Sequence, residues 1–272
     1  MIASRPPRFA FVGPGNMARA IAAGMLEKQF FAAAAPLVCG RSRERLEDFE
    51  KKFGAQAASI EEVAERGDVV FFAVKPKDAE QALELWKNQK RERQGVLVSV
   101  IAGLPLARLQ ELAGSQWRVL RGMPNTAVEI GEGVTAFCSE NAREEDWLLL
   151  ESIFSRLGKF LRLSESQMDA LTAASGSGIA FFLAMIEQMV AAAVQEGLSE
   201  EEALAAVSQS AVGAGRLCQM VARSPRELRE AVTSPNGTTA AGLEAMRKRD
   251  FSAAIRAAIQ AASKRSKELS RL

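Results

Sequence analysis

The stretch RFAFVGPGNMARAIAAG, residues 8–24, decides how the first part of this chain folds. Its opening letters form a short apolar run typical of a buried strand, and the later ones are helix formers with apolar side chains at helical spacing. Between the two parts stands the pattern G-x-G-x-x-A, whose glycines let the backbone approach a pyrophosphate at a helix N-terminus. We therefore predict dinucleotide contacts here, the alternative being a tight turn that binds nothing. The residues concerned are Gly13, Pro14, Gly15, Asn16 and Met17.

The residues that follow alternate between short apolar runs and amphipathic or charged segments. The runs that we expect to be strands are residues 36–40, 68–74, 95–100, 117–122, 133–138 and 158–163. The segments that we expect to be helices are residues 15–28, 41–54, 76–88 and 144–158. Such a series predicts a parallel sheet with helices on both faces and right-handed crossovers. Residues 1–163 are thus expected to form an α/β domain of the Rossmann type.

The pattern changes near Ser164, and residues 164–272 show helix signals only. Breaks are expected at Gly176–Gly178, at Ser199, where Glu202 completes a capping box, and at Ser224-Pro225. The helix at 179–194 is apolar nearly all round and must be buried on most sides. Either the other helices of an all-helical domain wrap it or, as we expect, a second copy covers it in a homodimer.

Composition excludes several kinds of site. The chain has 272 residues, 35 basic and 33 acidic, so its charge gives no reason to expect nucleic acid or a membrane surface as a partner. It contains no histidine and no tyrosine, which excludes a histidine base or ligand and a tyrosine proton donor. Cys39, Cys138 and Cys218 are far apart and are expected to be buried thiols without metal. The N-terminus lacks a signal-peptide pattern and the run at 179–194 is short for a membrane span, so we expect a cytoplasmic protein.

The second predicted strand indicates which dinucleotide is bound. Sites that prefer NAD usually place an acidic residue at the end of this strand, against the ribose hydroxyls. Here Arg41, Ser42 and Arg43 follow the strand and no carboxylate does. Guanidinium groups and a hydroxyl suit a 2′-phosphate, so we predict NADPH as the cofactor, with NADH as an alternative. The other interpretation is that these arginines, with Arg45, form the solvated face of a helix.

Further contacts are expected beyond the carboxyl ends of the neighbouring strands, where ligands of such sheets lie. Lys75 would meet a ribose, a phosphate or only water. Ala102, with Gly103, would leave room for a nicotinamide ring. The residues that we expect to bind cofactor at these two strand ends are Ala73, Val74, Lys75, Pro76 and Ala102.

Motifs spread along the chain resemble those of the pyrroline-5-carboxylate reductase family. They are GPGNMA (13–18), GRS (40–42), AVKP (73–76), SVIAG (99–103), MPNT (123–126), DALTAASGSG (169–178), VTSPNGTT (232–239) and RS (265–266). The resemblance covers Phe9 to Leu269, and residues 232–239 are its most specific part. It implies NAD(P)H-dependent reduction of L-Δ1-pyrroline-5-carboxylate to L-proline, the last step of proline biosynthesis. It also implies a helical domain interlocked with its partner's in a homodimer, and several members of the family assemble further, often into decamers.

The resemblance also implies how the substrate is held. The loop would bind the substrate carboxylate through Ser234, Asn236, Gly237, Thr238 and Thr239. Backbone N–H groups at a helix N-terminus, together with hydroxyls, form such a cradle without arginine. Thr239 would be the catalytic residue, with its hydroxyl nearest the imine nitrogen. The alternative is that these threonines merely cap the next helix, and we expect that one of them does.

Asn125 of the MPNT motif is predicted to contact the cofactor on its nicotinamide side; a plain turn between two strands is the alternative. The chain departs from the family pattern at Ala127 and Ile179, where proline is usual, and at Asn236, where glycine is usual. Asparagine tolerates left-handed backbone angles, so the loop conformation can survive that change. The two lost prolines concern local rigidity more than chemistry.

Two other functions stay open at this point. One is another NADPH-dependent imine or β-hydroxyacid reductase; those enzymes typically use a helix lysine or aspartate as proton donor, and residues 173–178 contain neither. The other is a non-catalytic NADP(H)-binding sensor, against which the intact Ser234 and Thr239 argue.

Overall fold

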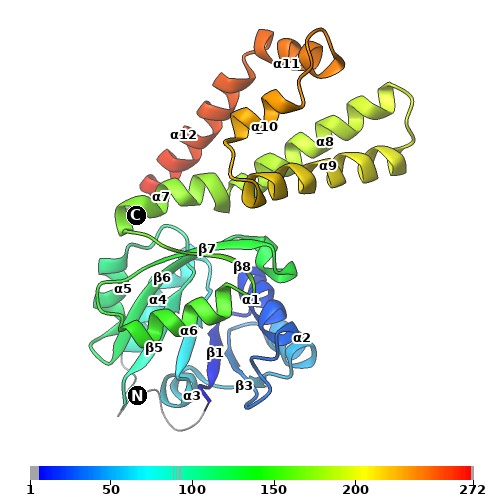
Figure 1. Ribbon diagram of the computed structural model, residues 1–272. Coiled ribbons are helices and arrows are strands. Elements are labelled where there is room, and N and C mark those ends of the chain that lie inside the picture. Colours follow the sequence, from blue (N-terminus) through cyan, green and yellow to red (C-terminus); the bar gives the residue numbers. More distant parts are fainter. Residues whose placement is uncertain (1–5, 88, 90, 92, 271–272) are drawn as a thin grey trace. The chain divides into compact units, whose positions relative to one another are not determined.

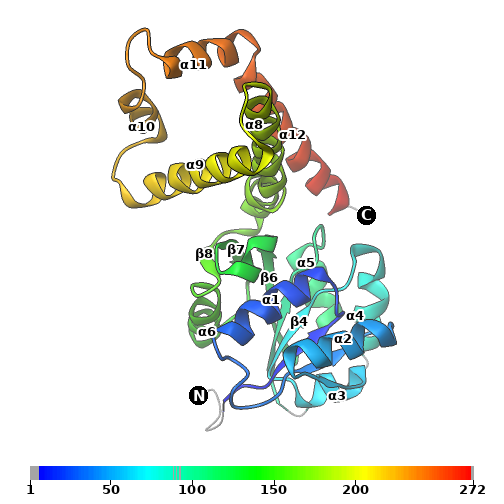
Figure 2. The same ribbon diagram turned by 90° about the vertical axis from the view of Figure 1, so that its right-hand side faces the viewer.

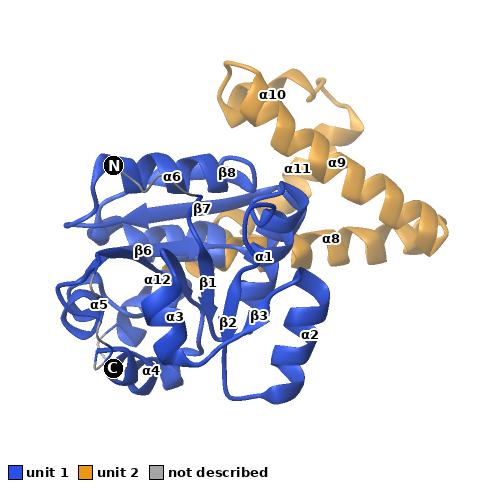
Figure 3. Cartoon of the chain, turned by 90° about the horizontal axis from the view of Figure 1, so that it is seen from below, with its two compact units in different colours: residues 1–176, 262–272 blue, residues 177–261 orange. Residues whose placement is uncertain are grey.

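The protein is described here by a computed structural model that covers residues 6–87, 89, 91 and 93–270. The chain divides into two compact units, drawn in different colours in Figure 3. Unit 1 comprises Met1–Gly176 and Ala262–Leu272, and unit 2 comprises Ser177–Ala261. The domain boundary predicted between residues 163 and 164 differs from this division and stays a prediction. Asn88, where one predicted helix ended, and the outer ends of both predicted domains, residues 1–5 and 271–272, lie outside the described residues.

Unit 1 is built around a sheet whose eight strands, counted over the described residues, follow the order β3-β2-β1-β4-β5-β6-β7-β8 (Figure 1). The strands are β1 (Phe9–Val12), β2 (Leu37–Cys39), β3 (Gln56–Ala57), β4 (Val69–Phe72), β5 (Gly95–Ser99), β6 (Trp117–Pro124), β7 (Gly133–Cys138) and β8 (Gly158–Arg162). The order of the first six is that of dinucleotide-binding sheets. The predicted Rossmann-type fold is confirmed.

The sheet is parallel except at one pair of strands, so the prediction of a parallel sheet is wrong there. β6 and β7 run antiparallel, with Met123 opposite Ala136. The connection between them is short and consists mainly of the 3-10 helix η2 (Thr126–Ile130), followed by Gly131 at φ 77°. A crossover to a parallel strand needs about a dozen residues or more, so this connection returns the chain in the opposite direction.

Helices cover both faces of the sheet, as predicted. They are α1 (Asn16–Glu27), α2 (Arg43–Phe53), α3 (Ile60–Arg66), η1 (Pro76–Asp78), α4 (Ala79–Lys87), α5 (Leu106–Ala113) and α6 (Glu144–Phe154). Side chains of β1 alternate between two cores. Phe9 and Phe11 pack with α1, α2 and α6, whereas Ala10 and Val12 pack with α3, α4 and α5. Every residue of β1 is therefore buried, which is why its sequence is continuously apolar.

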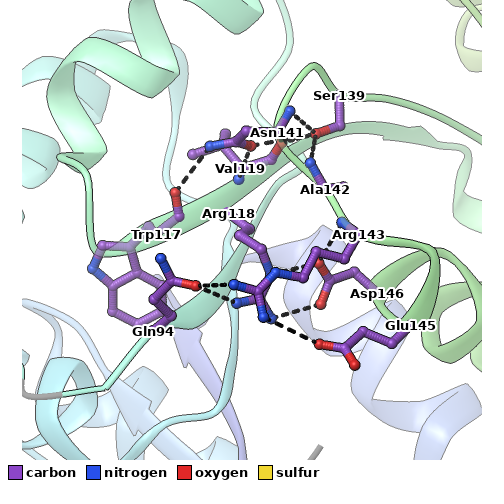
Figure 4. A network of polar contacts seen from close by, with 10 residues as sticks. All are labelled: Gln94, Trp117, Arg118, Val119, Ser139, Asn141, Ala142, Arg143, Glu145 and Asp146. Atoms are coloured by element: carbon purple, nitrogen blue, oxygen red, sulfur yellow. Dashed lines mark hydrogen bonds and ion pairs between the residues drawn. The ribbon is translucent and has the colours of Figure 1, made fainter. Parts of the chain in front are cut away.

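A buried ion pair fixes the start of α6 against β6 (Figure 4). Arg118 approaches Asp146 with Nε at 2.5 Å from Oδ2 and Nη2 at 2.7 Å from Oδ1. The same Oδ2 accepts the backbone N–H of Arg143 at 2.9 Å, at the first turn of the helix. Asp146 is fully buried, so these hydrogen bonds replace the water that its carboxylate gives up on folding.

Replacing Asp146 with alanine is expected to lower the free energy of unfolding by about 3–5 kcal/mol, because it leaves the Arg118 charge without its partner in a largely buried place. Glu144→Ala is the control, since Glu144 pairs with Arg162 on the surface and such pairs contribute little. Urea denaturation of both variants measures the difference. Equal stabilities for the two variants would contradict the assigned role of the buried pair.

The secondary structure of unit 2 is entirely helical over its described residues, with loops between the helices. They are α8 (Gly178–Gln195), α9 (Glu200–Met220), α10 (Pro225–Ala231), α11 (Thr238–Lys248) and the first part of α12 (Phe251–Leu269). α8 and α9 pack side by side (Figure 1). α9 begins at the predicted capping box of Ser199 and Glu202, and α10 begins at the predicted Ser224-Pro225 start. An extended loop joins α10 to α11 (Figure 2).

The predicted break at Gly176–Gly178 is present but short: the π-helical turn Thr172–Gly176 ends there, Ser177 is a turn residue, and α8 begins at Gly178. The chain is helical on both sides of this residue. A helical run extends over Glu165–Gln195. Among the described residues, this is the one helix that has the length and the apolar composition to cross a membrane. The expectation that this region is too short rested on residues 179–194 alone.

The apolar helices of unit 2 leave much of their surface uncovered by the rest of the chain. Their large exposed side chains include Phe182, Leu183, Met189, Leu204, Val212 and Met220. Cys218 is exposed on the same unit, so the prediction of three buried thiols holds for Cys39 and Cys138 only. The alternative in which other helices of the same chain wrap the apolar helix 179–194 is also wrong. Within α8 only Gly178 is buried, and the other residues of the helix are partly or fully exposed.

Candidate functional site

A cavity of about 1110 Å³ lies in unit 1 at the carboxyl ends of β1, β2 and β4. The predicted cofactor-binding residues that line it are Gly13, Pro14, Gly15, Asn16, Met17, Arg41, Ser42, Ala73, Val74 and Lys75. Lining residues that the sequence analysis did not predict to bind cofactor are Val12, Cys39, Gly40, Glu44, Arg45, Ala58, Ser59, Ile60, Lys77, Asp78, Gln81, Ala82 and Leu85. The predicted residues outside this lining are Arg43, Pro76, Ala102 and Asn125.

The turn after β1 brings its backbone close to the end of β4. Gly13 has φ 93°, and a Cβ on it would lie 2.8 Å from Cγ1 and 3.0 Å from the backbone N of Val74. Its own N–H donates to the carbonyl of Cys39 at 2.9 Å. α1 then begins with Gly15 as its N-cap, and no side chain occupies the N-terminal N–H groups of the helix. These free N–H groups and the missing side chains fit a pyrophosphate.

The charged groups of the cavity lie beyond β2 and β4. Arg41 forms an ion pair with Asp78, Nη2 to Oδ2 at 2.7 Å. The residues that follow β2 in sequence, Arg41, Ser42 and Arg43, include no carboxylate, but the fold brings one to Arg41 from η1. Ser42 caps α2, its Oγ accepting the N–H of Arg45 at 3.4 Å. Cationic side chains still outnumber acidic ones in the lining, which suits an anionic ligand; they are Arg41, Arg45, Lys75 and Lys77, against Glu44 and Asp78.

The remaining walls are apolar. Ile60 and Leu85 line the cavity from α3 and α4, and Ala58 and Ala82 are next to them in the lining. Cys39 adds a neutral side chain, because burial raises the pKa of its thiol to about 12. A flat adenine ring requires such a surface, with few polar contacts. Cationic groups beside an apolar wall thus match the two ends of a phosphorylated adenosine.

Asn125 has both ends of its amide engaged inside unit 1. Its Oδ1 accepts the N–H of Val134 at 3.2 Å, and its Nδ2 donates to Oγ of Ser175 at 3.2 Å. Asn125 is only 8% exposed. Ser175, which the sequence analysis did not single out, belongs to the π-helical turn, and π-turns recur at functional sites. A direct contact of Asn125 with cofactor stays a prediction; the structure shows a residue that positions Ser175.

The end of β5 is less open than expected. Gly103 has φ 78°, and a Cβ on it would lie 2.8 Å from Cβ of Leu269. The space beside Gly103 is thus filled by the last turn of α12, and only Ala102 keeps the expected role of leaving room. Nearby, Ser266 donates to Oδ1 of Asp169 at 2.6 Å, so a residue of the RS motif contacts a residue of DALTAASGSG.

In unit 2, the loop at residues 232–239 ends at the N-terminus of α11. Asn236 has φ 60°, so the predicted left-handed backbone is confirmed. Gly237 donates its N–H to the carbonyl of Ser234 at 3.1 Å, and a Cβ on it would collide with Oγ of Ser234. Gly237 is also the N-cap, so the expectation that Thr238 or Thr239 caps the helix is wrong.

The hydroxyl groups of this loop divide into two kinds. Thr233 donates its Oγ1–H to the carbonyl of Arg229 at 2.7 Å and so closes the end of α10. Thr238 and Thr239 instead occupy the first two positions of α11, where helix geometry leaves the backbone N–H groups without intrahelical partners. Two hydroxyl-bearing residues thus occupy the first turn of a helix whose N–H groups are suited to a carboxylate.

Comparisons with known proteins show which family the chain resembles. Residues 165–269 match the family described as pyrroline-5-carboxylate reductase dimerisation, and residues 8–103 match that of NADP oxidoreductase, coenzyme F420-dependent. A pyrroline-5-carboxylate reductase of Arabidopsis thaliana is 37% identical, over 97% of this chain and 95% of its own. The structure of a Coxiella burnetii pyrroline-5-carboxylate reductase is 31% identical with a TM-score of 0.87, covering 98% of this chain and 99% of its own.

A further solved structure carries a nucleotide. The Plasmodium falciparum pyrroline carboxylate reductase with NADP bound is 29% identical to this chain with a TM-score of 0.86, over 98% of this chain and 100% of its own. The matches thus extend over nearly the whole length of this chain and of its relatives. Together with the cavity and the loop, they show that the chain belongs to the pyrroline-5-carboxylate reductase family.

Proposed function

We infer that the protein reduces L-Δ1-pyrroline-5-carboxylate to L-proline with NADPH, the last step of proline biosynthesis, with NADH as an alternative donor. The observation that carries this conclusion is the cavity at the G-x-G-x-x-A turn, in a chain that matches the reductases over 97% of its length. When bound, NADPH supplies a hydride for the imine carbon. The residues of the chain have to bind the cofactor and the substrate, orient them, and provide a proton for the imine nitrogen.

Different residues of the cavity would contact different parts of the cofactor. The turn Gly13–Met17 and the N-terminus of α1 would receive the pyrophosphate. Arg41 and Ser42 would contact the 2′-phosphate, and Lys75 a ribose or phosphate. Arg43 does not line the cavity, and its Nε pairs with Glu47 at 2.7 Å on the exposed side of α2. Asn125 would act at the nicotinamide side through Ser175.

The substrate needs a carboxylate site and a proton. We propose that Ser234, Asn236, Gly237, Thr238 and Thr239 hold the carboxylate through N–H groups and hydroxyls at the start of α11. The imine nitrogen gains a proton as its carbon accepts the hydride. The hydroxyl of Thr239 would donate a hydrogen bond to that nitrogen and relay the proton from solvent, which suits a chain without histidine or tyrosine.

The exposed apolar side chains of unit 2 support self-association, and the region matches a dimerisation family. We propose a homodimer in which the helices of two copies interlock and cover these side chains, with further assembly, up to a decamer, open to this chain. A second copy would also account for the apolar run of α8 without a membrane. We propose the cytoplasm as the place of the reaction.

The carboxylate requirement tests the proposed substrate. Replacing L-Δ1-pyrroline-5-carboxylate with Δ1-pyrroline, the same ring without the carboxylate, is expected to lower kcat/KM about 100-fold or more, because charge-assisted hydrogen bonds contribute about 1.5–3 kcal/mol each. NADPH oxidation followed at its absorbance band measures both rates. Equal rates would instead favour a general imine reductase, and binding of NADPH without turnover of either ring would favour a sensor.

A further inference from the structure

The ion pair between Arg41 and Asp78 lies at the edge of the nucleotide cavity, and both residues line it. Arg41 lies two residues beyond the end of β2, after Gly40, whereas Asp78 ends η1, which follows β4. The N–H of Asp78 donates to the carbonyl of Lys75 at 2.9 Å, and Pro76 is the first residue of that turn. The turn after β4 thus holds the Asp78 carboxylate against the guanidinium that follows β2.

The two partners differ in exposure. The side chain of Arg41 is 74% exposed and that of Asp78 is 21% exposed, so the guanidinium is more open to a ligand than the carboxylate is. Arg41 has five N–H donors, and its ion pair with Asp78 is made through Nη2 at 2.7 Å. A 2′-phosphate at this guanidinium would share it with Asp78 and would meet the negative charge of the carboxylate nearby.

We propose that Asp78 is a specificity-determining residue that limits the preference for NADPH over NADH. The inference rests on the proposed function, because it assigns a role to a residue of the same cavity. Asp78 neutralises part of the Arg41 charge and opposes a dianionic phosphate, so the attraction for the 2′-phosphate is smaller than Arg41 alone would give. NADH has no 2′-phosphate and is therefore not repelled by Asp78 in this way, so it can still bind.

Asp78→Asn tests this, because asparagine keeps the shape and an acceptor oxygen for Arg41 but removes the charge. The probes are adenosine 2′,5′-bisphosphate and 5′-AMP, which differ only in the 2′-phosphate; calorimetry gives the Kd of each, and fluorescence titration gives those of NADPH and NADH. The variant is expected to bind the bisphosphate about five to ten times more tightly relative to 5′-AMP than the wild type does. The gain should shrink at high ionic strength, because exposed charges are screened.

Glu47→Gln is the matched control, since Glu47 pairs with Arg43 at 2.7 Å on α2 and neither residue lines the cavity. That variant should leave the ratio of affinities unchanged. Arg41→Gln should lower the preference for the 2′-phosphate, and Asp78→Asn added to it should then have a smaller effect than in the wild type. An unchanged or lowered ratio in Asp78→Asn overturns the proposal, because a lowered ratio means that Asp78 only orients Arg41.

The same titrations separate this proposal from the proposed function. A wild-type protein that binds neither the bisphosphate nor NADPH would overturn both. A wild-type protein that binds them and reduces L-Δ1-pyrroline-5-carboxylate, with a preference that Asp78→Asn leaves unchanged, would overturn the role of Asp78 alone.

Discussion

Gly13→Ala is expected to weaken NADPH binding about 100-fold or more. The new Cβ would lie 2.8 Å from Cγ1 and 3.0 Å from the backbone N of Val74. Because the clash includes the backbone at the end of β4, rotation of a side chain cannot relieve it. The φ of 93° adds strain for any residue other than glycine. The turn would have to move away from β4, and the N–H groups of α1 would move with it. Fluorescence titration with NADPH measures the loss.

Gly54→Ala separates this effect from a general loss of stability. Gly54 ends α2 with φ 62°, and a Cβ there would meet nothing within 4 Å. That variant carries a similar backbone strain of about 1 kcal/mol but should bind NADPH like the wild type. If the two variants bound NADPH equally well, the turn at Gly13 would not be the pyrophosphate site.

Thr239→Val is expected to lower kcat about 100-fold while leaving the Kd of NADPH unchanged. Valine has the shape of threonine, so the change removes a hydroxyl and leaves the helix start in place. The expected size follows from the effect of a positioned proton donor, about 100-fold or more in rate. Because Gly237 and not Thr239 is the N-cap, little stability should be lost, and steady-state kinetics will report the chemical role directly.

Thr233→Val provides the comparison within the same loop. Its hydroxyl bonds to the carbonyl of Arg229 at the end of α10, so its loss should reduce stability slightly and leave kcat within about twofold. An effect on kcat as large as that of Thr239→Val would show that the loop responds to any lost hydroxyl. An unchanged kcat in Thr239→Val would remove Thr239 from the reaction.

Much of the fold could be predicted because its signals are local. The fingerprint turn, the buried strands and the capping residues Ser199 and Ser224 each act within a few residues. The short strand β3 was not predicted, because its two residues are exposed and have no apolar pattern. α3 and α5 were overlooked although signals were present: Ser59 and Glu62 form a capping box, and Gly114 follows α5.

The site was predictable where its residues lie at the ends of predicted strands. Residues 13–17 and 41–42 sit on strand ends, so the topology of the sheet places them in the cavity. Asp78 meets Arg41 through the packing of two separate loops, and Ser175 meets Asn125 through the π-helical turn; neither pairing leaves a periodic pattern in the sequence. The same holds for Leu269, which fills the space beside Gly103 from the far end of the chain.

The most direct test of the proposed reaction is transfer of a labelled hydride. The purified protein is given L-Δ1-pyrroline-5-carboxylate and NADPH carrying deuterium at the transferable position of C4, and the product is analysed by mass spectrometry and NMR. The account predicts L-proline with one deuterium at Cδ, the former imine carbon, formed mole for mole with NADP⁺. Oxidation of NADPH without labelled proline, or bound NADPH that is not oxidised at all, would contradict it.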